Sequence, residues 1–244
     1  EHAKRERVLK DLVPGVLELA QLAKSYGIGC TVDAEESDRL ELSLDIIEQV
    51  FSDASLSGWD GFGVVVQAYQ KRTPYTIDHL ADMARRAGRR LQVRLVKGAY
   101  WDAEIKRAQI EGYPGYPVFT RKQNTDVSYL ACAKRLFTHA DAIYPMFATH
   151  NAHTIAAVRS IANGGVYEHQ KLHGMGDDLY AEVVPADRLG LPCRVYAPVG
   201  SHEDLLPYLV RRLLENGANS SFVNRITDER VPIADLIRDP VEMV

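Results

Sequence analysis

The sequence predicts an α/β fold with a mostly parallel sheet, in the form of a partial or trimmed barrel. Strand-like and helical periodicities alternate along most of the 244 residues, and each expected strand ends in polar or glycine-rich sequence. Such alternation favours parallel strands with right-handed crossovers, in a closed barrel or a doubly wound sheet. The GxGxxG and Walker A fingerprints are absent from the sequence, which weakens the doubly wound, dinucleotide-binding alternative.

Six strands are expected, and short apolar runs mark them. The strongest run covers residues 63–66 and is continuously apolar, as in a strand buried on both faces of a parallel sheet. A closed barrel needs two more strands. One is expected around residues 220–223, and another would have to precede residue 1. The six expected strands lie, in chain order, near residues 30, 64, 93, 145, 169 and 195.

Helices are expected between these strands. The first spans residues 6–26, ends at Gly27 and contains Pro14, where it could bend or divide. Residues 37–51 form an amphipathic helix with Ser37 as its expected N-cap. The later helices are expected over residues 75–86, from 101 onward, over 125–139, up to 162 and over 203–216, with a short helix between 176 and 193.

Composition and charge indicate one globular domain over residues 1–244. With a net charge of −4, the chain has no excess of positive charge with which to bind nucleic acid. No apolar run approaches the length of a membrane span, and no signal peptide opens the sequence. Cys30, Cys132 and Cys193 lie far apart without CxxC spacing, which argues against a disulfide framework and against a zinc site. A reducing, cytosolic setting is therefore expected.

The octet Arg-Leu-Val-Lys-Gly-Ala-Tyr-Trp at residues 94–101 is the most informative segment. A strand delivers Arg94 and Lys97 and then breaks at Gly98. Burying unpaired charge costs several kcal/mol, so two cations rarely lie inside a strand. The carboxyl end of a strand is where α/β barrels carry their chemistry. The alternative is a strand whose end is simply solvated.

Polar side chains collect at the other expected strand ends as well, and a barrel would bring them to one mouth. The set is Asp33, Gln67, Arg94, Lys97, Thr149, His150, Asn151, His173 and Tyr196.

Three kinds of site could use this set. A metal-dependent hydrolase could use His150, His153, Asp33 and His173 as ligands. A glycosidase pair would have to come from the acids of residues 33–36, all on one segment. The wealth of hydrogen-bond donors fits a flavin or another large polar cofactor better.

The last expected helix, over residues 203–216, carries an unusual pair of arginines. Tyr208 and Arg211 lie three residues apart on one face, and Arg212 and Glu215 lie three apart on a neighbouring face. Arginine is the preferred bidentate partner of a carboxylate, so the pair could bind a carboxylate substrate. The alternative is an exposed face with an Arg–Glu ion pair worth well under about 1 kcal/mol.

Five separated motifs together closely resemble the proline dehydrogenase domain of the bacterial bifunctional proline utilization A proteins. They are residues 94–101, 147–153, 172–176, 196–200 and 208–219. The resemblance covers about residues 4–240. It implies a distorted (β/α)8, TIM-like barrel excised from a longer chain. It also implies non-covalent FAD and the oxidation of L-proline to Δ1-pyrroline-5-carboxylate.

The resemblance also assigns roles around the flavin, which accepts the hydride at N5. Arg94 is expected near N5 as a catalytic residue, with Lys97 and Gln67 near the pyrimidine edge. A fixed cation there stabilises the charge of the reduced flavin. The remaining expected cofactor contacts are Val96, Gly98, Ala99, Thr120, Arg121, Lys122, Thr149, His150, Asn151, Arg212, Glu215, Ser221 and Phe222.

For the substrate, the resemblance implies that Arg211 and Arg212 pair with the proline carboxylate. The ring is expected to lie against Tyr100, Leu172, Tyr196 and Tyr208. Asp33 and Tyr196 are further catalytic candidates, although Asp33 could equally be a partner of Arg94 or Lys97.

The resemblance implies several partners. They are small carboxylate inhibitors, a quinone acceptor and a covalently joined pyrroline-5-carboxylate dehydrogenase domain. A cytoplasmic location is expected, with at most peripheral contact at the inner face of the bacterial membrane, and no nucleic acid is expected to bind this domain.

One departure from the family bears on activity. The family carries an additional strand whose lysine helps to hold the substrate carboxylate, and this sequence has no counterpart. The barrel is therefore expected to be trimmed at its N-terminal end. A scaffold that binds FAD poorly stays an alternative to the enzyme.

Overall fold

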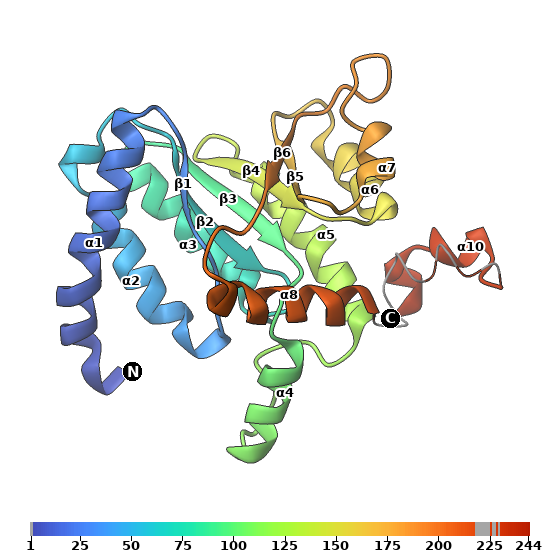
Figure 1. Cartoon of the computed structure of the whole chain (residues 1–244), viewed down its shortest axis with the longest axis horizontal. Coiled ribbons are helices and arrows are strands. Elements are labelled where there is room, and N and C mark those ends of the chain that lie inside the picture. The colour runs from blue at the N-terminus through green and yellow to red at the C-terminus, as the bar shows by residue number, and fades with distance from the viewer. Residues whose placement is uncertain (1, 218–224, 226–227, 229) are drawn as a thin grey trace. The chain divides into compact units, whose positions relative to one another are not determined.

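The computed structural model describes residues 2–217, 225, 228 and 230–244, with side chains left out of the description for His2 and residues 213–217 (Figure 1). The chain divides into two compact units, residues 1–145 and 146–244, and each is described by itself.

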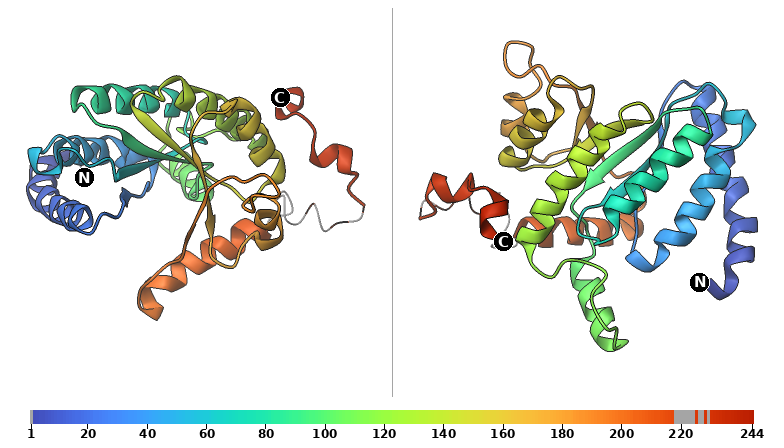
Figure 2. Two further views of the ribbon diagram at one scale, coloured as in Figure 1. Left: turned by 90° about the horizontal axis from the view of Figure 1, so that it is seen from above. Right: turned by 180° about the vertical axis from the view of Figure 1, so that it is seen from behind.

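The first unit alternates strands and helices. Its elements are α1 (Arg5–Ser25), β1 (Cys30–Val32), α2 (Leu40–Phe51), β2 (Phe62–Gln67), α3 (Thr73–Arg86), β3 (Leu91–Val96), α4 (Trp101–Ile110) and α5 (Lys122–Thr138), with 3-10 turns at His2–Lys4, Ser37–Arg39 and Ala54–Leu56. β2 pairs in parallel with both β1 and β3, so the carboxyl ends of the three strands lie at one edge. Figure 2 (right) shows α5, α3 and α2 in a row over one face of this sheet, with α1 beside α2.

The sequence of each strand explains its burial. All six residues of β2 are buried, as expected for an apolar run covered on both faces. In β3, Leu91, Val93 and Leu95 are buried, while the alternate residues are only partly buried. Because successive side chains point to opposite faces of a strand, Arg94 lies on the face opposite that buried apolar set.

The second unit continues the same alternation. Its elements are β4 (Ile143–Ala148, which begins in the first unit), α6 (Ala152–Ala162), β5 (Glu168–Leu172), α7 (Asp177–Ala181), β6 (Cys193–Tyr196), α8 (His202–Gly217), α10 (Ile233–Leu236) and a final 3-10 turn at Pro240–Met243. β5 pairs in parallel with β4 and with β6.

The α/β class and all six expected strands are confirmed. The strands follow the sheet order β1-β2-β3-β4-β5-β6, so sequence neighbours are also sheet neighbours. The strand expected at residues 220–223 lies outside the described residues, and the described part of the chain does not close an eight-stranded barrel. None of the described helices combines the length and the apolar character that crossing a membrane requires.

Three local expectations need correction. Ser37 does not cap the following helix: it lies in a 3-10 turn, α2 begins only at Leu40, and the Ser37 hydroxyl donates to Glu104 instead. α1 is one continuous helix over Arg5–Ser25, so Pro14 does not divide it. α5 begins at Lys122 rather than at residue 125, which places Lys122 in the first turn of that helix.

A buried histidine marks the core of the second unit. His169 in β5 is fully buried among the rings of Phe147, Tyr167 and Tyr180, with ring centroids 5.2 to 6.5 Å from its own. Burial lowers the pKa of His169 from 6.5 to about 4, and the backbone of Phe147 offsets this only in part. The imidazole is therefore neutral in the folded protein at physiological pH.

This burial predicts a loss of stability in mild acid. Below its ordinary pKa of 6.5, His169 takes up a proton in the unfolded chain, but in the folded chain only near pH 4. His169 is therefore expected to lower the free energy of unfolding by about 2 kcal/mol between about pH 8 and about pH 5. Urea unfolding at the two pH values measures it. In the His169→Leu variant this decrease in the free energy of unfolding should be absent. If the variant loses as much stability as the parent between the two pH values, the assignment to His169 is contradicted.

Candidate active site

The site residues expected from the sequence fall into two sets, one in each compact unit. The first set comprises Asp33, Gln67, Arg94, Val96, Lys97, Gly98, Ala99, Tyr100, Thr120, Arg121 and Lys122. The second comprises Thr149, His150, Asn151, Leu172, Tyr196, Tyr208, Arg211, Arg212 and Glu215.

An ion pair joins the ends of β1 and β3. Nη2 of Arg94 donates to Oδ1 of Asp33 at 2.9 Å. The Arg94 side chain is 14% exposed, whereas that of Asp33 is 72% exposed. The geometry makes Asp33 a partner that holds the guanidinium in place. A catalytic role for either residue stays a prediction.

Gln67 ties the loop after β1 to the end of β2. Its side chain is buried, and Nε2 donates to the backbone oxygen of Glu35 at 2.8 Å. The hydroxyl of Thr73 donates to the backbone oxygen of Gln67. Tyr100 reaches the same loop, because its hydroxyl donates to Oε2 of Glu35 at 2.8 Å.

Lys97 and Lys122 share one carboxylate. Nζ of Lys122 lies 2.9 Å from Oδ2 of Asp126, and Nζ of Lys97 donates to Oδ1 of the same side chain. Burial would raise the pKa of Asp126, but the two lysines outweigh it and hold that pKa below its ordinary value. The sequence analysis missed Asp126. Its spacing of four residues from Lys122 on one helix was the available signal.

Gly98 is required by a close approach of its backbone to a ring. Its φ of +133° lies in a region that other residues avoid, and a Cβ there would lie 2.5 Å from the ring of Tyr69. Tyr69 is buried and lies two residues after the end of β2. The turn after β3 can therefore form only with glycine at this position.

Backbone hydrogen bonds fix the glycine- and proline-rich loop that carries Thr120 and Arg121. Phe119 N donates to Tyr69 O at 2.8 Å, and Lys71 N donates to Pro117 O at 3.0 Å. The indole Nε1 of Trp101 donates to Phe119 O at 2.8 Å. Thr120 and Arg121 are exposed at the entry to α5, whose N-terminus has no side-chain cap.

In the second unit, the end of β4 is shaped by its own polar residues. Asn151 caps α6, because its side-chain oxygen accepts from Thr154 N at 3.2 Å. Asn151 N in turn donates to the hydroxyl oxygen of Thr149 at 3.1 Å. His150 Nε2 accepts from Leu172 N at 3.3 Å, which links the end of β4 to the end of β5.

Leu172 and Tyr196, both expected beside the substrate ring, are paired across β5 and β6. The backbone continues this pairing, since His173 N donates to Tyr196 O at 2.9 Å. On α8 the guanidinium carbon of Arg212 lies 5.0 Å from the ring centroid of Tyr208, in a cation–π contact. Glu215's side chain, Ser221 and Phe222 lie outside what the structure describes.

The metal-dependent alternative gains no support. Within the described ranges, no group of three or more histidine, cysteine, aspartate or glutamate side chains could hold a metal ion. His150 instead uses Nε2 in the backbone contact to Leu172.

Comparison with known proteins identifies the family. The family model for proline dehydrogenase matches residues 3–225. The bifunctional protein PutA of Klebsiella aerogenes is 59% identical over 99% of this chain and 19% of that protein. The PutA protein of Rhizobium meliloti is 60% identical over 98% of this chain and 20% of that protein.

Solved structures agree with the sequence comparison. A variant of Bradyrhizobium japonicum proline utilization A (PutA) superposes with a TM-score of 0.96 at 56% identity, over 100% of this chain and 25% of that chain. The chain thus spans about a fifth of the length of these two curated relatives. The resemblance predicted from the five motifs is confirmed, and the chain belongs to the proline dehydrogenase family.

Proposed function

We propose that this chain carries the FAD-dependent oxidation of L-proline to Δ1-pyrroline-5-carboxylate, the first step of proline catabolism to glutamate. The observation that carries the proposal is the cationic end of β3, where Arg94 is held by Asp33, and Lys97 by Asp126. Membership of the proline dehydrogenase family supports the same reaction. The complete fold in this proposal is a (β/α)8 barrel.

The donor set of the first unit fits FAD. FAD carries a pyrophosphate, and the N-terminus of a helix is a ready site for such an anion. α5 begins at Lys122 without a side-chain cap, next to Thr120 and Arg121. The two lysines and Asp126 together keep one positive charge. In this proposal Thr120, Arg121 and Lys122 contact the phosphates or the adenosine.

Bound flavin would supply the chemistry by accepting a hydride at N5. Arg94 and Lys97 would face the side of the flavin that gains negative charge. Arg94 can stabilise that charge without moving, since Asp33 already orients its guanidinium at 2.9 Å. Gln67 would present its amide oxygen, because its amide nitrogen is used by Glu35 O. Val96, Gly98 and Ala99 would allow close backbone approach.

The second unit would supply the substrate contacts and the rest of the cofactor site. Arg211 and Arg212 would bind the proline carboxylate, with Arg212 oriented by its stacking on Tyr208. Leu172 and Tyr196, paired across β5 and β6, would pack against the ring together with Tyr100 and Tyr208. The proposed further cofactor contacts are Thr149, His150, Asn151, Glu215, Ser221 and Phe222.

The wider setting is also part of the proposal. The relatives are bifunctional and about five times longer than this chain, which supports a covalently joined pyrroline-5-carboxylate dehydrogenase domain. Electrons would pass from the flavin to a quinone, in the cytoplasm or at the inner face of the membrane.

The first test is spectroscopic. The full chain is expected to bind FAD, and L-proline added without oxygen is expected to bleach the flavin absorption, because the hydride stays on the cofactor. A cyclic-ether carboxylate of the same ring size lacks the oxidisable amine and should leave the absorption in place. A protein that is colourless and cannot be reconstituted with FAD would contradict the proposal.

The second test concerns the carboxylate site. Arg211→Met is expected to raise the KM for proline at least about tenfold, since losing a charge-assisted partner costs about 1.5–3 kcal/mol and about 1.4 kcal/mol is one decade. The dissociation constant of the cyclic-ether carboxylate should rise equally, and Arg212→Met should act in the same direction. Arg188→Met is the matched control, because Arg188 forms an exposed pair with Glu182 in the same unit. Parent-like inhibitor affinity in both α8 variants would exclude the pair as the carboxylate site.

A further inference from the structure

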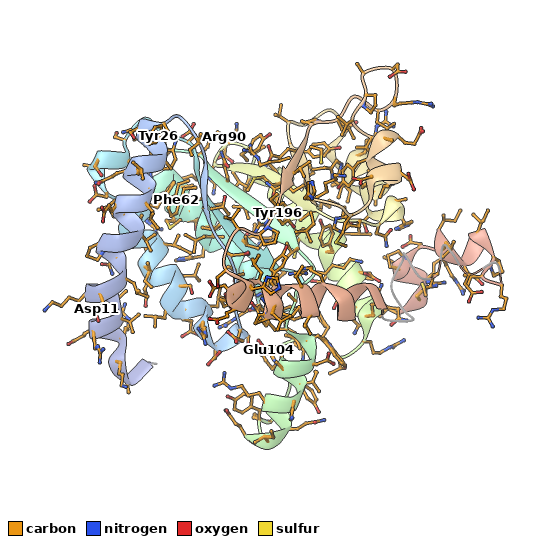
Figure 3. All side chains as sticks on the ribbon, viewed as in Figure 1. Asp11, Tyr26, Phe62, Arg90, Glu104 and Tyr196 are labelled. Atoms are coloured by element: carbon orange, nitrogen blue, oxygen red, sulfur yellow. The ribbon has the colours of Figure 1, made fainter. Side chains whose placement is uncertain are left out.

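Glu104, which no sequence motif singled out, is a buried carboxylate next to the predicted site. It lies in the first turn of α4, three residues after Trp101, and is only 4% exposed. Figure 3 labels it where α4 begins. Both of its oxygens accept hydrogen bonds from a single residue: Oε1 from Ser37 N at 2.5 Å and Oε2 from Ser37 Oγ at 2.6 Å.

Ser37 belongs to the segment 33–39, which we term the acidic loop. α4 and the residue before it hold this loop at two further points: Tyr100 contacts Glu35, and Arg107 lies 2.6 Å from Asp38. Arg72, from the turn after β2, donates to the backbone oxygen of Ser37. Gln67, at the end of β2, also donates to the backbone oxygen of Glu35 at 2.8 Å. The acidic loop is thus attached on two sides, by α4 and by residues at and just after the end of β2, and Ser37 takes part in both attachments.

The acidic loop carries two of the side chains that reach the β3 end. Asp33 holds Arg94 at 2.9 Å, and Glu35 accepts from the Tyr100 hydroxyl at 2.8 Å. Asp33 is largely exposed, so its own surroundings restrain it little. Its position therefore depends on how the loop is anchored. Two buried side chains anchor it: Gln67, which donates to the backbone oxygen of Glu35 at 2.8 Å, and Glu104, which accepts from Ser37.

The energetics favour a single loop conformation. A buried carboxylate that loses its hydrogen-bond donors costs several kcal/mol, so displacing Ser37 is strongly disfavoured. Both groups that donate to Glu104 are neutral, so these hydrogen bonds involve no lysine or arginine side chain. We propose that Glu104 is a positioning residue for the reaction: through Ser37 it fixes the acidic loop and thereby holds Asp33 against Arg94 and Glu35 against Tyr100. This inference rests on the proposed function.

The test compares three substitutions in the full chain. Glu104→Ala removes the anchor. Glu104→Gln retains it, because the amide can accept from Ser37 N and donate to Ser37 Oγ. Glu111→Ala is the matched control, because it removes an exposed carboxylate just after the same helix that pairs with Arg107 rather than with Ser37.

Two readouts are used. The first is amide hydrogen exchange of residues 33–39, which needs neither cofactor nor substrate. The second is the anaerobic rate of flavin reduction at saturating proline.

For Glu104→Ala we expect faster exchange in the acidic loop and a reduction rate at least about tenfold lower, since small misplacements of site groups are costly. Affinity for the cyclic-ether carboxylate should stay near the parent value. Glu104→Gln should recover most of the parent's protection from exchange and most of its reduction rate. Glu111→Ala should match the parent in both measurements. If Glu104→Ala does not fold, Ser37→Ala removes one of the two contacts and should shift both readouts in the same direction.

The proposal is overturned if exchange in the acidic loop is the same in Glu104→Ala and Glu111→Ala. It is also overturned if the loop loosens while the reduction rate stays at the parent value, because the anchor would then be structural only. A parent chain that proline does not reduce would instead refute the proposed function, and hydrogen exchange would still test the anchor on its own.

Discussion

The strand ends of the first unit depend on one constraint: a charged group removed from water needs a partner with good geometry. Arg94, Asp126 and Glu104 are all largely withdrawn from solvent, and each meets a partner there. For Arg94 and Glu104 the partner comes from the loop after β1, more than sixty residues away in sequence. Satisfying these groups therefore also fixes the loops between the strands and helices.

Local patterns predicted the framework of the fold. In β2 the continuous apolar run predicts a strand covered on both faces, and all six of its residues are buried. In β3 the structure shows that Leu91, Val93 and Leu95 form the buried face of the predicted strand. These signals lie within a few residues of the element they define. For that reason all six strands could be located from the sequence alone, although the ends of helices such as α5 shifted by a few residues.

The contacts that position the site could not be predicted in the same way. Ser37 has the residue type and place of an N-cap, yet its hydroxyl serves a carboxylate 67 positions further along the chain. A buried acceptor outweighs a local cap, because leaving Glu104 unsatisfied costs more than a cap contributes. Asp126 was missed for a related reason: its spacing from Lys122 reads as an ordinary surface pair, and only the fold adds Lys97 to it.

The choice of neutral donors for Glu104 fits the charge balance at the end of β3. Arg94, Lys97 and Lys122 face Asp33 and Asp126, which leaves one net positive charge in this cluster. Glu104 is held by the serine N–H and hydroxyl, so its hydrogen bonds do not draw on any of these three cations. The acidic loop is therefore anchored without pairing Arg94, Lys97 or Lys122 with Glu104, and these cations stay at the strand end, where an anionic cofactor would need them.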